Sequence, residues 1–524
     1  MSAETQEPVR GAREGKYILA HDVGTSGNKA ALVDLRGRVV GKSIHPYETH
    51  YPKSDWAEQE PEDWWRAIAA STREVLERTG ISGKDVACMT FSFQMLGIVP
   101  MSAEAKPLRP AIIWIDNRAS EEARKVMRRL GGPKTFAMAA GAEISGKDGI
   151  PKLLWLKKHE PDVYSKMACF LDVGGYLIAR STGRMVMDWS GASAFGFKLK
   201  KKRWMSGMMR YFGIDPSKLP SLVRSIDVVG GLTAQAASEC GLPEGTPVVA
   251  GAGDVPSASV GSGAVREGDG HLYLGTSGWV AVVTKSSPTG KHGIAVIQSA
   301  DPSHNIILAE METAGACVEW AAKELYGEVE KRDGRDAAFA LMNADAAQAP
   351  AGSNYLLFTP WMYGERSPVH DEFVRSTFVN LSLDHTRAHM MRSVYEGVSY
   401  NVRWVTEILE RDFGAKLPTL RVIGGGAKSR PWMQIMADVT QRRVETVQET
   451  QEAGAVGAAL CAAVGLGLHP DFESLASAVK PAEVFQPSPD HVAVYDTLFA
   501  AYKETYARLK PLYHKLNSRR FEQA

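Results

Sequence analysis

The stretch YILAHDVGTSGNKAALV, residues 17–33, places an apolar run, a Gly-Thr-Ser-Gly turn and a second apolar run in succession. A second stretch, HLYLGTSGWVAVV at residues 271–283, repeats this order around the same tetrapeptide. Strand, glycine-bounded turn and strand are typical of a β-hairpin. Single turns of this kind recur by chance, but matching flanks about half the chain apart predict two similarly built halves, each with a hairpin near its start.

Outward from these hairpins, strand patterns alternate with helix patterns. A third strand after Gly37 completes a meander to residue 44, and a helix is expected from Glu62 to Arg78 with Gly80 as its stop. Further strands are expected at 86–92, 111–115 and 420–423, and further helices at 120–130, 151–159, 313–325, 386–411, 431–440 and 453–464. The alternation predicts an α/β protein whose sheets carry helices on both faces.

The chain length of 524 residues predicts more than one domain. We place the boundary near Val260, so that the first domain covers residues 17–260 and the second covers 261–515. Residues 1–16 are polar and lack the apolar segment of a signal peptide, which predicts a loose tail.

Composition narrows the function classes. The net charge is +1, so nothing in the overall balance favours a nucleic acid or a membrane surface as partner, and the basic run at 198–203 reads as a solvated loop. No apolar run is long enough to cross a bilayer. The five cysteines form no C-x-x-C pair and the histidines show no zinc spacing. We expect a cytoplasmic protein without a bound metal of its own.

Glycine-rich turns supply many backbone N–H groups, the donors that phosphate oxygens need at close approach. The turn at 424–429, GGGAKS, fails the P-loop pattern because Ala427 precedes the lysine. The stretch Gly251 to Asp254 lacks the third glycine of a dinucleotide site. Each turn alone could serve tight packing, but together with the two hairpins they indicate a phosphate site.

Two acids lie where phosphoryl transfer would need them. Asp22 ends the first strand two residues before Gly24, so its carboxylate can face a Mg²⁺ ion carried by a nucleotide. Asp254 follows an apolar run and a glycine turn, a position that suits a general base. For an isolated aspartate in a turn, capping of the next helix is an equally good interpretation.

These residues belong to a series of motifs that resembles the FGGY family of carbohydrate kinases, and its xylulokinase-like branch most closely. The resemblance covers nearly the whole chain after the tail, and the order and spacing of the motifs make it specific. The motifs are DVGTSG at 22–27, DWAEQEPEDWW at 55–65, SFQMLG at 92–97, WIDNR at 114–118, PKLLWL at 151–156, GAGD at 251–254, YGERSP at 363–368, DHTRAH at 384–389 and GGGAKSRPWMQIMADV at 424–439.

The resemblance implies two ribonuclease-H-like domains, as in the actin and hexokinase superfamily, that close over a central cleft. It implies ATP and Mg²⁺ as cofactors, with Asp254 as the general base. It also assigns the binding residues: Asp22, Thr25 and Ser26 to the first phosphate loop, Gly275 and Thr276 to the second, Gly315, Gly425 and Gly426 to the nucleotide, and Gln94, Met95, Leu96, Asp116 and Arg118 to the sugar side.

One departure from the family pattern bears on the substrate. The xylulokinase-like branch typically has Q-M-H-G where this chain has Gln94-Met95-Leu96-Gly97. A histidine can hydrogen-bond a sugar hydroxyl and Leu96 cannot, which disfavours a substrate with a hydroxyl there by about 1–3 kcal/mol. The resemblance therefore implies phosphorylation of a small sugar, a ketopentose first, with another ketose or a polyol such as erythritol or glycerol as the alternative.

Two other functions stay open from the sequence. An actin-like ATPase would use the same nucleotide clamps without a sugar, and a sugar sensor would bind without turnover. Homodimers are common in the family, so a homodimer is a further expectation from the resemblance.

Overall fold

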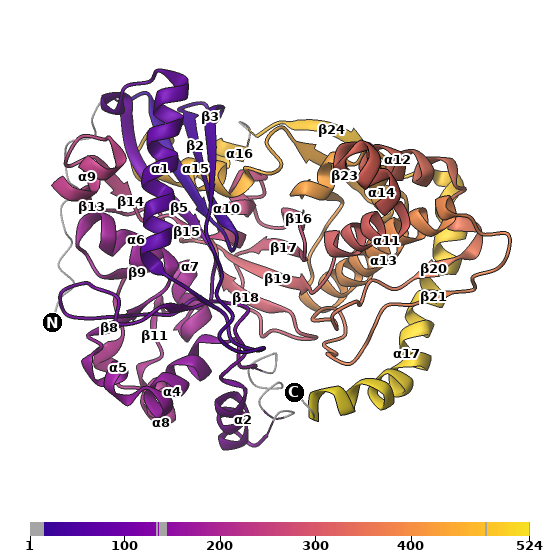
Figure 1. The fold of residues 1–524 in the computed structure, drawn as a ribbon, viewed down its shortest axis with the longest axis horizontal. Coiled ribbons are helices and arrows are strands. Elements are labelled where there is room, and N and C mark those ends of the chain that lie inside the picture. The colour runs from indigo at the N-terminus through magenta and orange to yellow at the C-terminus, as the bar shows by residue number, and fades with distance from the viewer. Residues whose placement is uncertain (1–14, 133–134, 136–143, 477–478, 523–524) are drawn as a thin grey trace.

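The computed structural model describes residues 15–132, 135, 144–476 and 479–522. The chain forms two halves, each built on a seven-stranded sheet, and helix α17 (Val492–Glu522) runs along the outer side of the second half (Figure 1). The predicted two-domain α/β architecture is confirmed. The tail predicted at 1–16 lies outside the described residues up to residue 14, and the Lys16 N–H donates to the Asp85 carbonyl at 2.8 Å.

The first sheet begins with the predicted meander of β1 (Tyr17–Val23), β2 (Gly27–Asp34) and β3 (Val39–Pro46), which pair antiparallel in that order. β5 (Val86–Phe93) joins β1 in parallel, and β14 (Pro247–Val249) and β15 (Ala252–Gly253) both pair in parallel with β5. β13 (Val228–Gly231) completes the edge. The carboxyl ends of β1, β5 and β15 therefore meet at one edge of the sheet.

The second sheet repeats this topology. β16 (Gly270–Leu274), β17 (Gly278–Thr284) and β19 (Asn305–Met311) form an antiparallel meander, and β22 (Thr419–Ile423) joins β16 in parallel. β23 (Arg443–Val447) pairs in parallel with β22, while β18 (Ala295–Gln298) and β24 (Pro481–Phe485) form the edges. The duplication inferred from the twin tetrapeptides is thus a duplication of five strands, since β1, β2, β3, β5 and β14 correspond to β16, β17, β19, β22 and β23.

Helices cover both faces of the first sheet. α1 (Pro61–Thr79), α6 (Val173–Thr182) and α9 (Ala234–Cys240) pack on one face through buried side chains such as Trp64 and Tyr176. α1 starts with a proline, carries two acids in its first turn and ends at Gly80, whose φ of 66° suits glycine. The opposite face is covered by α15 (Ala453–Gly465), a helix from the second half of the chain.

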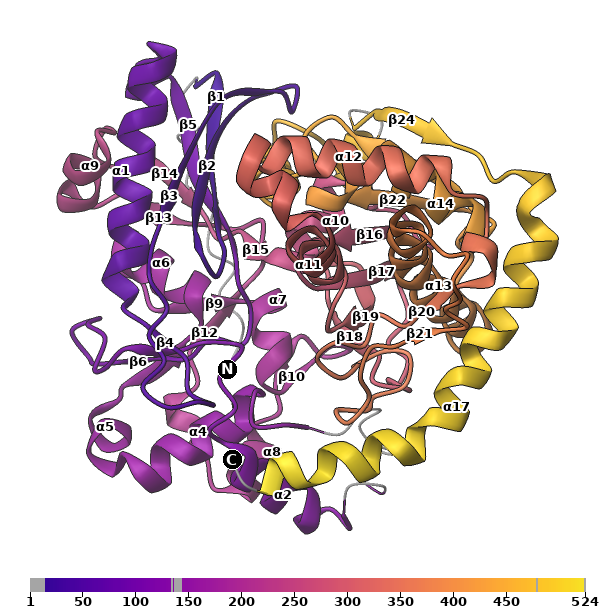
Figure 2. The same ribbon diagram turned by 45° about the vertical axis from the view of Figure 1, so that its right-hand side comes forward.

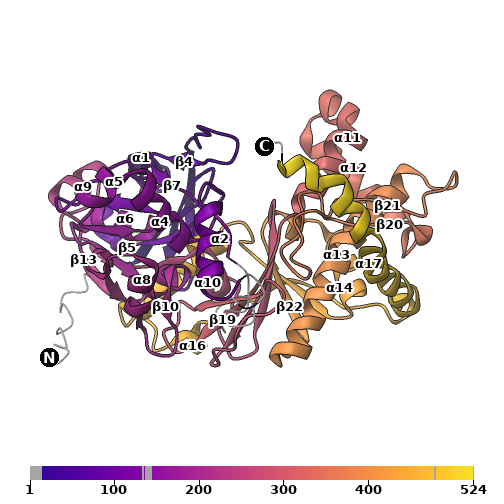
Figure 3. The same ribbon diagram turned by 90° about the horizontal axis from the view of Figure 1, so that it is seen from below.

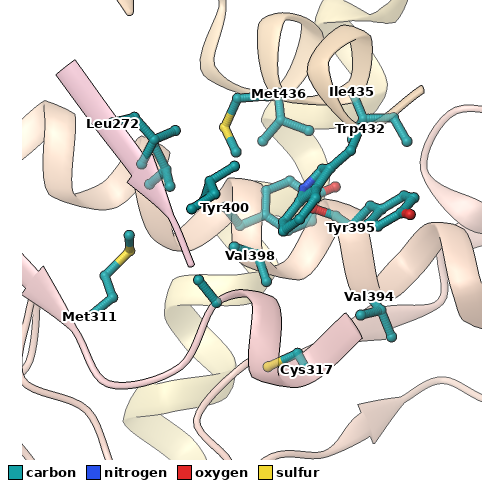
Figure 4. Close-up of a cluster of buried hydrophobic side chains, with 14 of the residues drawn as sticks. Leu272, Met311, Cys317, Val394, Tyr395, Val398, Tyr400, Trp432, Ile435 and Met436 are labelled. Carbon is teal, nitrogen blue, oxygen red and sulfur yellow. The ribbon is translucent and has the colours of Figure 1, made fainter. Parts of the chain in front are cut away.

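The second sheet has its largest core on the face covered by α11 (Gly315–Asp333), α13 (Arg387–Phe413) and α14 (Arg430–Thr440). Figure 4 shows part of this core, where the Trp432 indole stacks on the Tyr395 ring with 4.9 Å between centroids. The other face receives α10 (Asp254–Gly261), whose Val255 packs with Ala281, Ile306 and Leu308. A helix from the first half of the chain therefore covers the second sheet.

The two helices that each cover the sheet of the other half, α10 and α15, pack against each other and are labelled close together in Figure 1. Figure 2 draws α10 between the two halves. Glycine makes this crossing close: a Cβ added to Gly457 would lie 1.7 Å from the Ser257 carbonyl oxygen, and one on Gly261 would lie 1.9 Å from the Ala453 oxygen. In Figure 3, α16 (Phe472–Ala476) also lies against the first half, where Phe472 packs with Val260. The halves are thus joined by backbone-to-backbone packing.

The remaining elements are short or flank the two sheets. The strand predicted at 111–115 is shorter than expected, because only Ala111–Ile112 pairs and the chain then turns toward the site. The other elements are β4 (Glu58–Gln59), β6 (Val99–Met101), β7 (Ala111–Ile112), β8 (Cys169–Leu171), β9 (Val186–Asp188), β10 (Phe197–Lys198), β11 (Arg203–Trp204), β12 (Ser221–Val223), β20 (Leu357–Phe358), β21 (Phe378–Val379), α2 (Ser120–Arg129), α4 (Gly149–His159), α5 (Pro161–Lys166), α7 (Trp189–Ala192), α8 (Ser206–Phe212) and α12 (Arg335–Gln348).

Candidate active site

The first glycine turn, residues 24–27, is fixed by hydrogen bonds within the turn and from its surroundings. The Gly24 N–H donates to the Gly27 carbonyl at 3.1 Å, and the Tyr47 N–H donates to the Ser26 carbonyl at 3.3 Å. The Trp114 indole donates to Thr25 Oγ1 at 2.8 Å. The loop is therefore rigid before any ligand arrives, which lowers the entropic cost of binding a phosphate there.

Asp22 lies just before this turn at the end of β1. Its Oδ1 accepts from Ser92 Oγ at 2.9 Å, and its Oδ2 lies 3.6 Å from Lys29 Nζ. The start of α15 backs the same carboxylate, because a Cβ added to Gly454 would lie 2.8 Å from Asp22 Oδ1. The Asp22 side chain is 16% exposed, so its carboxylate remains accessible to a ligand. Its hard oxygen donors suit the Mg²⁺ ion that was predicted for this position.

The second glycine turn sits on the start of α11. The Gly315 N–H donates to the Gly275 carbonyl at 2.8 Å, and the Ala316 N–H donates to the Thr276 carbonyl at 3.0 Å. A Cβ on Gly315 would lie 2.4 Å from the Gly275 oxygen, so this approach requires glycine. The structure thus brings together three residues that the sequence assigned to the nucleotide side.

The Gly424–Gly426 turn lies beside the second loop. Gly424 has a φ of +90°, and a Cβ there would lie 2.6 Å from the Leu274 carbonyl oxygen, directly before Gly275. A Cβ on Gly426 would lie 2.8 Å from the Leu274 Cβ. A Cβ on Gly425 would lie 3.7 Å from Gln451 Nε2.

Gln451 connects this turn to the first loop. Its backbone oxygen accepts from Lys29 Nζ at 3.3 Å, and Lys29 lies beside Asp22. A series of contacts therefore leads from the Gly424–Gly426 turn through Gln451 and Lys29 to Asp22.

Asp254 is the first residue of α10, and the cap position is occupied by Gly253. Its Oδ1 accepts from the Val255 N–H at 2.9 Å, while Oδ2 forms no hydrogen bond with any residue that the structure describes. Burial, then the carboxylate of Asp22, raises the pKa of Asp254 to about 7, and Glu310 acts in the same direction. A carboxylate of this kind can accept a proton near neutral pH.

A buried polar chain holds the turn before Asp254. The Gly253 N–H donates to Ser190 Oγ at 2.9 Å, and Ser190 Oγ donates to Asp188 Oδ2 at 2.6 Å. Ser225 Oγ donates to the same Asp188 oxygen at 2.8 Å. Because these groups are buried and bonded, they fix the backbone that carries Asp254.

The predicted sugar-side residues 94–96 lie beside the first glycine turn and the residue before Asp254. Gln94 is buried and donates to the Gly24 carbonyl at 3.2 Å. A Cβ on Gly253 would lie 2.6 Å from Met95 Sδ, so Met95 packs directly against the residue before Asp254. Leu96 has a φ of 62°, an unfavourable conformation for a leucine. Such local strain is concentrated at functional sites.

Asp116 and Arg118, also predicted for the sugar side, are bonded to each other. Arg118 Nη2 donates to Asp116 Oδ2 at 2.6 Å, and the Ala57 N–H donates to the same oxygen at 2.6 Å. The guanidinium lies 3.9 Å from the Trp56 ring centroid. Both side chains are fully buried, so their contact with a sugar stays a prediction. In this conformation their hydrogen bonds stabilise the backbone around the site.

Three charged residues near the site were not singled out from the sequence. Lys152 donates to the Leu96 carbonyl at 3.2 Å, and burial lowers its pKa to about 7 despite the opposing effect of Asp116. Glu310 contributes to the field at Asp254 and pairs with Arg366 at 2.5 Å. Lys152 lies in the PKLLWL motif and Arg366 in the YGERSP motif, so the sequence motifs could have indicated both residues. Glu310 is recognisable only from the sheet register.

The geometry defines a two-lobed protein of the actin and hexokinase type, with glycine loops from both lobes around a carboxylate. Residues 17–261 match the N-terminal domain of the FGGY family of carbohydrate kinases, and residues 270–466 match its C-terminal domain. The chain therefore belongs to the FGGY family of carbohydrate kinases, and the predicted resemblance and enzyme class are confirmed.

Relatives in two activity classes are similar to the chain over nearly its full length. The xylulose kinase of Bacillus subtilis is 30% identical over 96% of this chain and 99% of that protein. The gluconokinase of the same organism is 28% identical over 92% and 94%. The crystal structure of xylulose kinase from Rhodospirillum rubrum has a TM-score of 0.85 at 30% identity, covering 95% of this chain and 100% of the other.

No helix within the described parts of the chain has both the length and the apolar character to span a membrane.

Proposed function

We propose that this enzyme transfers the γ-phosphoryl group of Mg-ATP to a hydroxyl of a small neutral sugar, a ketopentose first, with Asp254 as general base. The observation that carries the proposal is the convergence at Asp254. The start of α10 presents a carboxylate with one oxygen that no described residue bonds. The charge of this carboxylate interacts with Asp22 beside the first loop and with Tyr273, which lies against Gly275 of the second loop. The proposed domains, residues 17–260 and 261–515, would each supply one loop.

In this mechanism, Asp254 Oδ2 accepts the proton of the sugar hydroxyl as its oxygen bonds to the γ-phosphorus. The bond between the γ-phosphorus and the β,γ-bridging oxygen breaks, and ADP leaves. The backbone N–H groups of Thr25 and Ser26 in the first loop and of Thr276 and Ser277 in the second hold the phosphate oxygens in line. Asp22, with its exposed oxygen, would hold the nucleotide's Mg²⁺, which neutralises phosphate charge when bound.

Charge near Asp254 supports a neutral substrate over a sugar acid. Arg366 is paired with Glu310 at 2.5 Å and with Glu312 at 3.1 Å, so its charge is already compensated. A carboxylate-bearing sugar would add a negative charge beside Asp22, Asp254 and Glu310. In the described part of the chain, the cations that contact these acids, Lys29 and Arg366, are already paired with them.

Leu96 supports a second candidate, a different ketose or a polyol such as erythritol or glycerol. Its side chain has no donor or acceptor for a sugar hydroxyl, and Lys152 holds its carbonyl. A substrate with an apolar edge or a shorter chain at this position would lose less than a ketopentose would.

The experiment is a coupled assay of ADP release over three- to six-carbon ketoses, polyols and gluconate. Stimulation by a ketopentose is the expected result, and stimulation by a polyol alone would select the second candidate. ADP release that no sugar alters would indicate an actin-like ATPase. Thermal stabilisation by a sugar without ADP release would indicate a sensor, and either of these outcomes overturns the proposal.

A further inference from the structure

Three side chains form a row across the second sheet on the face that receives α10. Tyr273 of β16 is paired with Trp279 of β17, and Trp279 is paired with Glu310 of β19. Ala281 and Leu308, which point to the same face, pack against Val255 of α10. Because α10 begins with Asp254, the row Tyr273–Trp279–Glu310 lies opposite the start of that helix.

The position of the Tyr273 ring is fixed by its neighbours. The ring stacks on the Trp279 indole with 4.0 Å between centroids and 13° between planes. The Trp279 Nε1–H donates to His271 Nε2 at 2.9 Å, so the indole is itself anchored. Stacking of two anchored aromatic rings leaves the phenol little rotational freedom.

The hydroxyl of Tyr273 reaches the second phosphate loop. A Cβ added to Gly275 would lie 2.5 Å from the Tyr273 hydroxyl oxygen, so the phenol lies directly against that glycine. The hydroxyl forms no hydrogen bond with any described residue. The side chain is partly buried and its hydroxyl oxygen is accessible from solvent, so a ligand atom can reach the hydroxyl and replace water as its partner.

The electrostatic surroundings keep this phenol protonated. Burial, then the carboxylates of Asp22 and Asp254, raises the pKa of Tyr273 to about 12. At neutral pH the side chain can therefore donate a hydrogen bond to an anion located between the two acids. An anion there needs such donors, because both carboxylates repel it.

We propose that the Tyr273 hydroxyl donates a hydrogen bond to an oxygen of the phosphoryl group as that group passes from nucleotide to sugar. This inference rests on the proposed function and adds a residue outside the glycine loops to the phosphate side. The contact with Gly275 favours a phosphate oxygen over a sugar hydroxyl as the acceptor.

The first test is Tyr273→Phe, which keeps the ring and its stacking and removes the donor. The expected result is a kcat about 10- to 100-fold below that of the unaltered enzyme, with the KM for the sugar within twofold. Tyr176→Phe is the matched control: this buried phenol donates to Glu62 at 3.0 Å, within the first half of the chain, and its loss should leave kcat unchanged. An unchanged kcat in Tyr273→Phe overturns the inference, and a raised KM for the sugar with unchanged kcat reassigns the contact to the sugar.

A second measurement separates this inference from the proposed function. Mg-ADP with aluminium fluoride mimics the transferring phosphoryl group, and we expect it to raise the melting temperature of the unaltered enzyme above the value with Mg-ADP alone. Tyr273→Phe should lose most of that additional increase while keeping the increase caused by Mg-ADP. If aluminium fluoride raises the melting temperature of both proteins by the same additional amount, the inference is overturned. This result does not depend on knowing the sugar substrate.

Discussion

Asp22 and Asp254 reach the same region from different strands, and the negative charge of Asp22 helps to raise the pKa of Asp254. Burial is the larger cause, and together they bring this pKa to about 7. The relationship links the two assigned roles, because the residue expected to hold Mg²⁺ also tunes the expected base. A bound Mg²⁺ ion would reduce this influence of Asp22.

The first prediction concerns pH. Asp254 acts as a base only when it is ionised, so kcat/KM should fall as the pH decreases through about 7. Glu310→Gln removes a negative charge that raises this pKa, and the acid limb of the profile should move to lower pH. Glu312→Gln is the matched control, since Glu312 shares Arg366 but is not among the causes of the shift. An acid limb that stays in place in Glu310→Gln contradicts the assignment.

The second prediction concerns the turn before Asp254. Ser190→Ala removes the acceptor of the Gly253 N–H, so we expect kcat to decrease about tenfold because the carboxylate loses its fixed orientation. Ser225→Ala removes a donor to the same Asp188 oxygen without touching Gly253. Both variants should lose about 1 kcal/mol of stability, measured by denaturant unfolding. Equal kcat values in the two variants would show that Ser190 acts on stability alone.

The third prediction concerns substrate preference. Leu96→His restores a polar side chain at a position with a φ of 62°, which histidine adopts more readily than leucine. We expect kcat/KM for a ketopentose to rise about tenfold relative to that for a four-carbon polyol, measured in competition. Leu96→Met, which stays apolar, is the control. The same ratio in both variants would remove position 96 from substrate selection.

Local patterns in the sequence predicted the hairpins, the strand that leads to Asp254 and the α/β class. The crossing of α10 and α15 left only an indirect trace, a run rich in glycine and alanine after residue 453, because it depends on packing between segments far apart in the chain. Tyr273 was overlooked for the same reason: its place beside Gly275 and Trp279 follows from the sheet register and stacking.

The sugar side was harder to predict than the phosphate side. Backbone donors at glycine turns are recognisable from sequence because glycine itself is required, as at Gly315. Side chains such as Asp116 and Arg118 can serve either a substrate or the architecture, and the structure shows them bonded to each other. Their role in sugar binding therefore stays a prediction.

The most direct test of the account is Asp254→Asn, an isosteric change that removes the proton acceptor. We expect a kcat about 100- to 10,000-fold below that of the unaltered enzyme on its best sugar. The increase in melting temperature caused by Mg-ADP should be retained, because the phosphate loops do not use this carboxylate. Turnover close to that of the unaltered enzyme would contradict the assignment of Asp254 as the base.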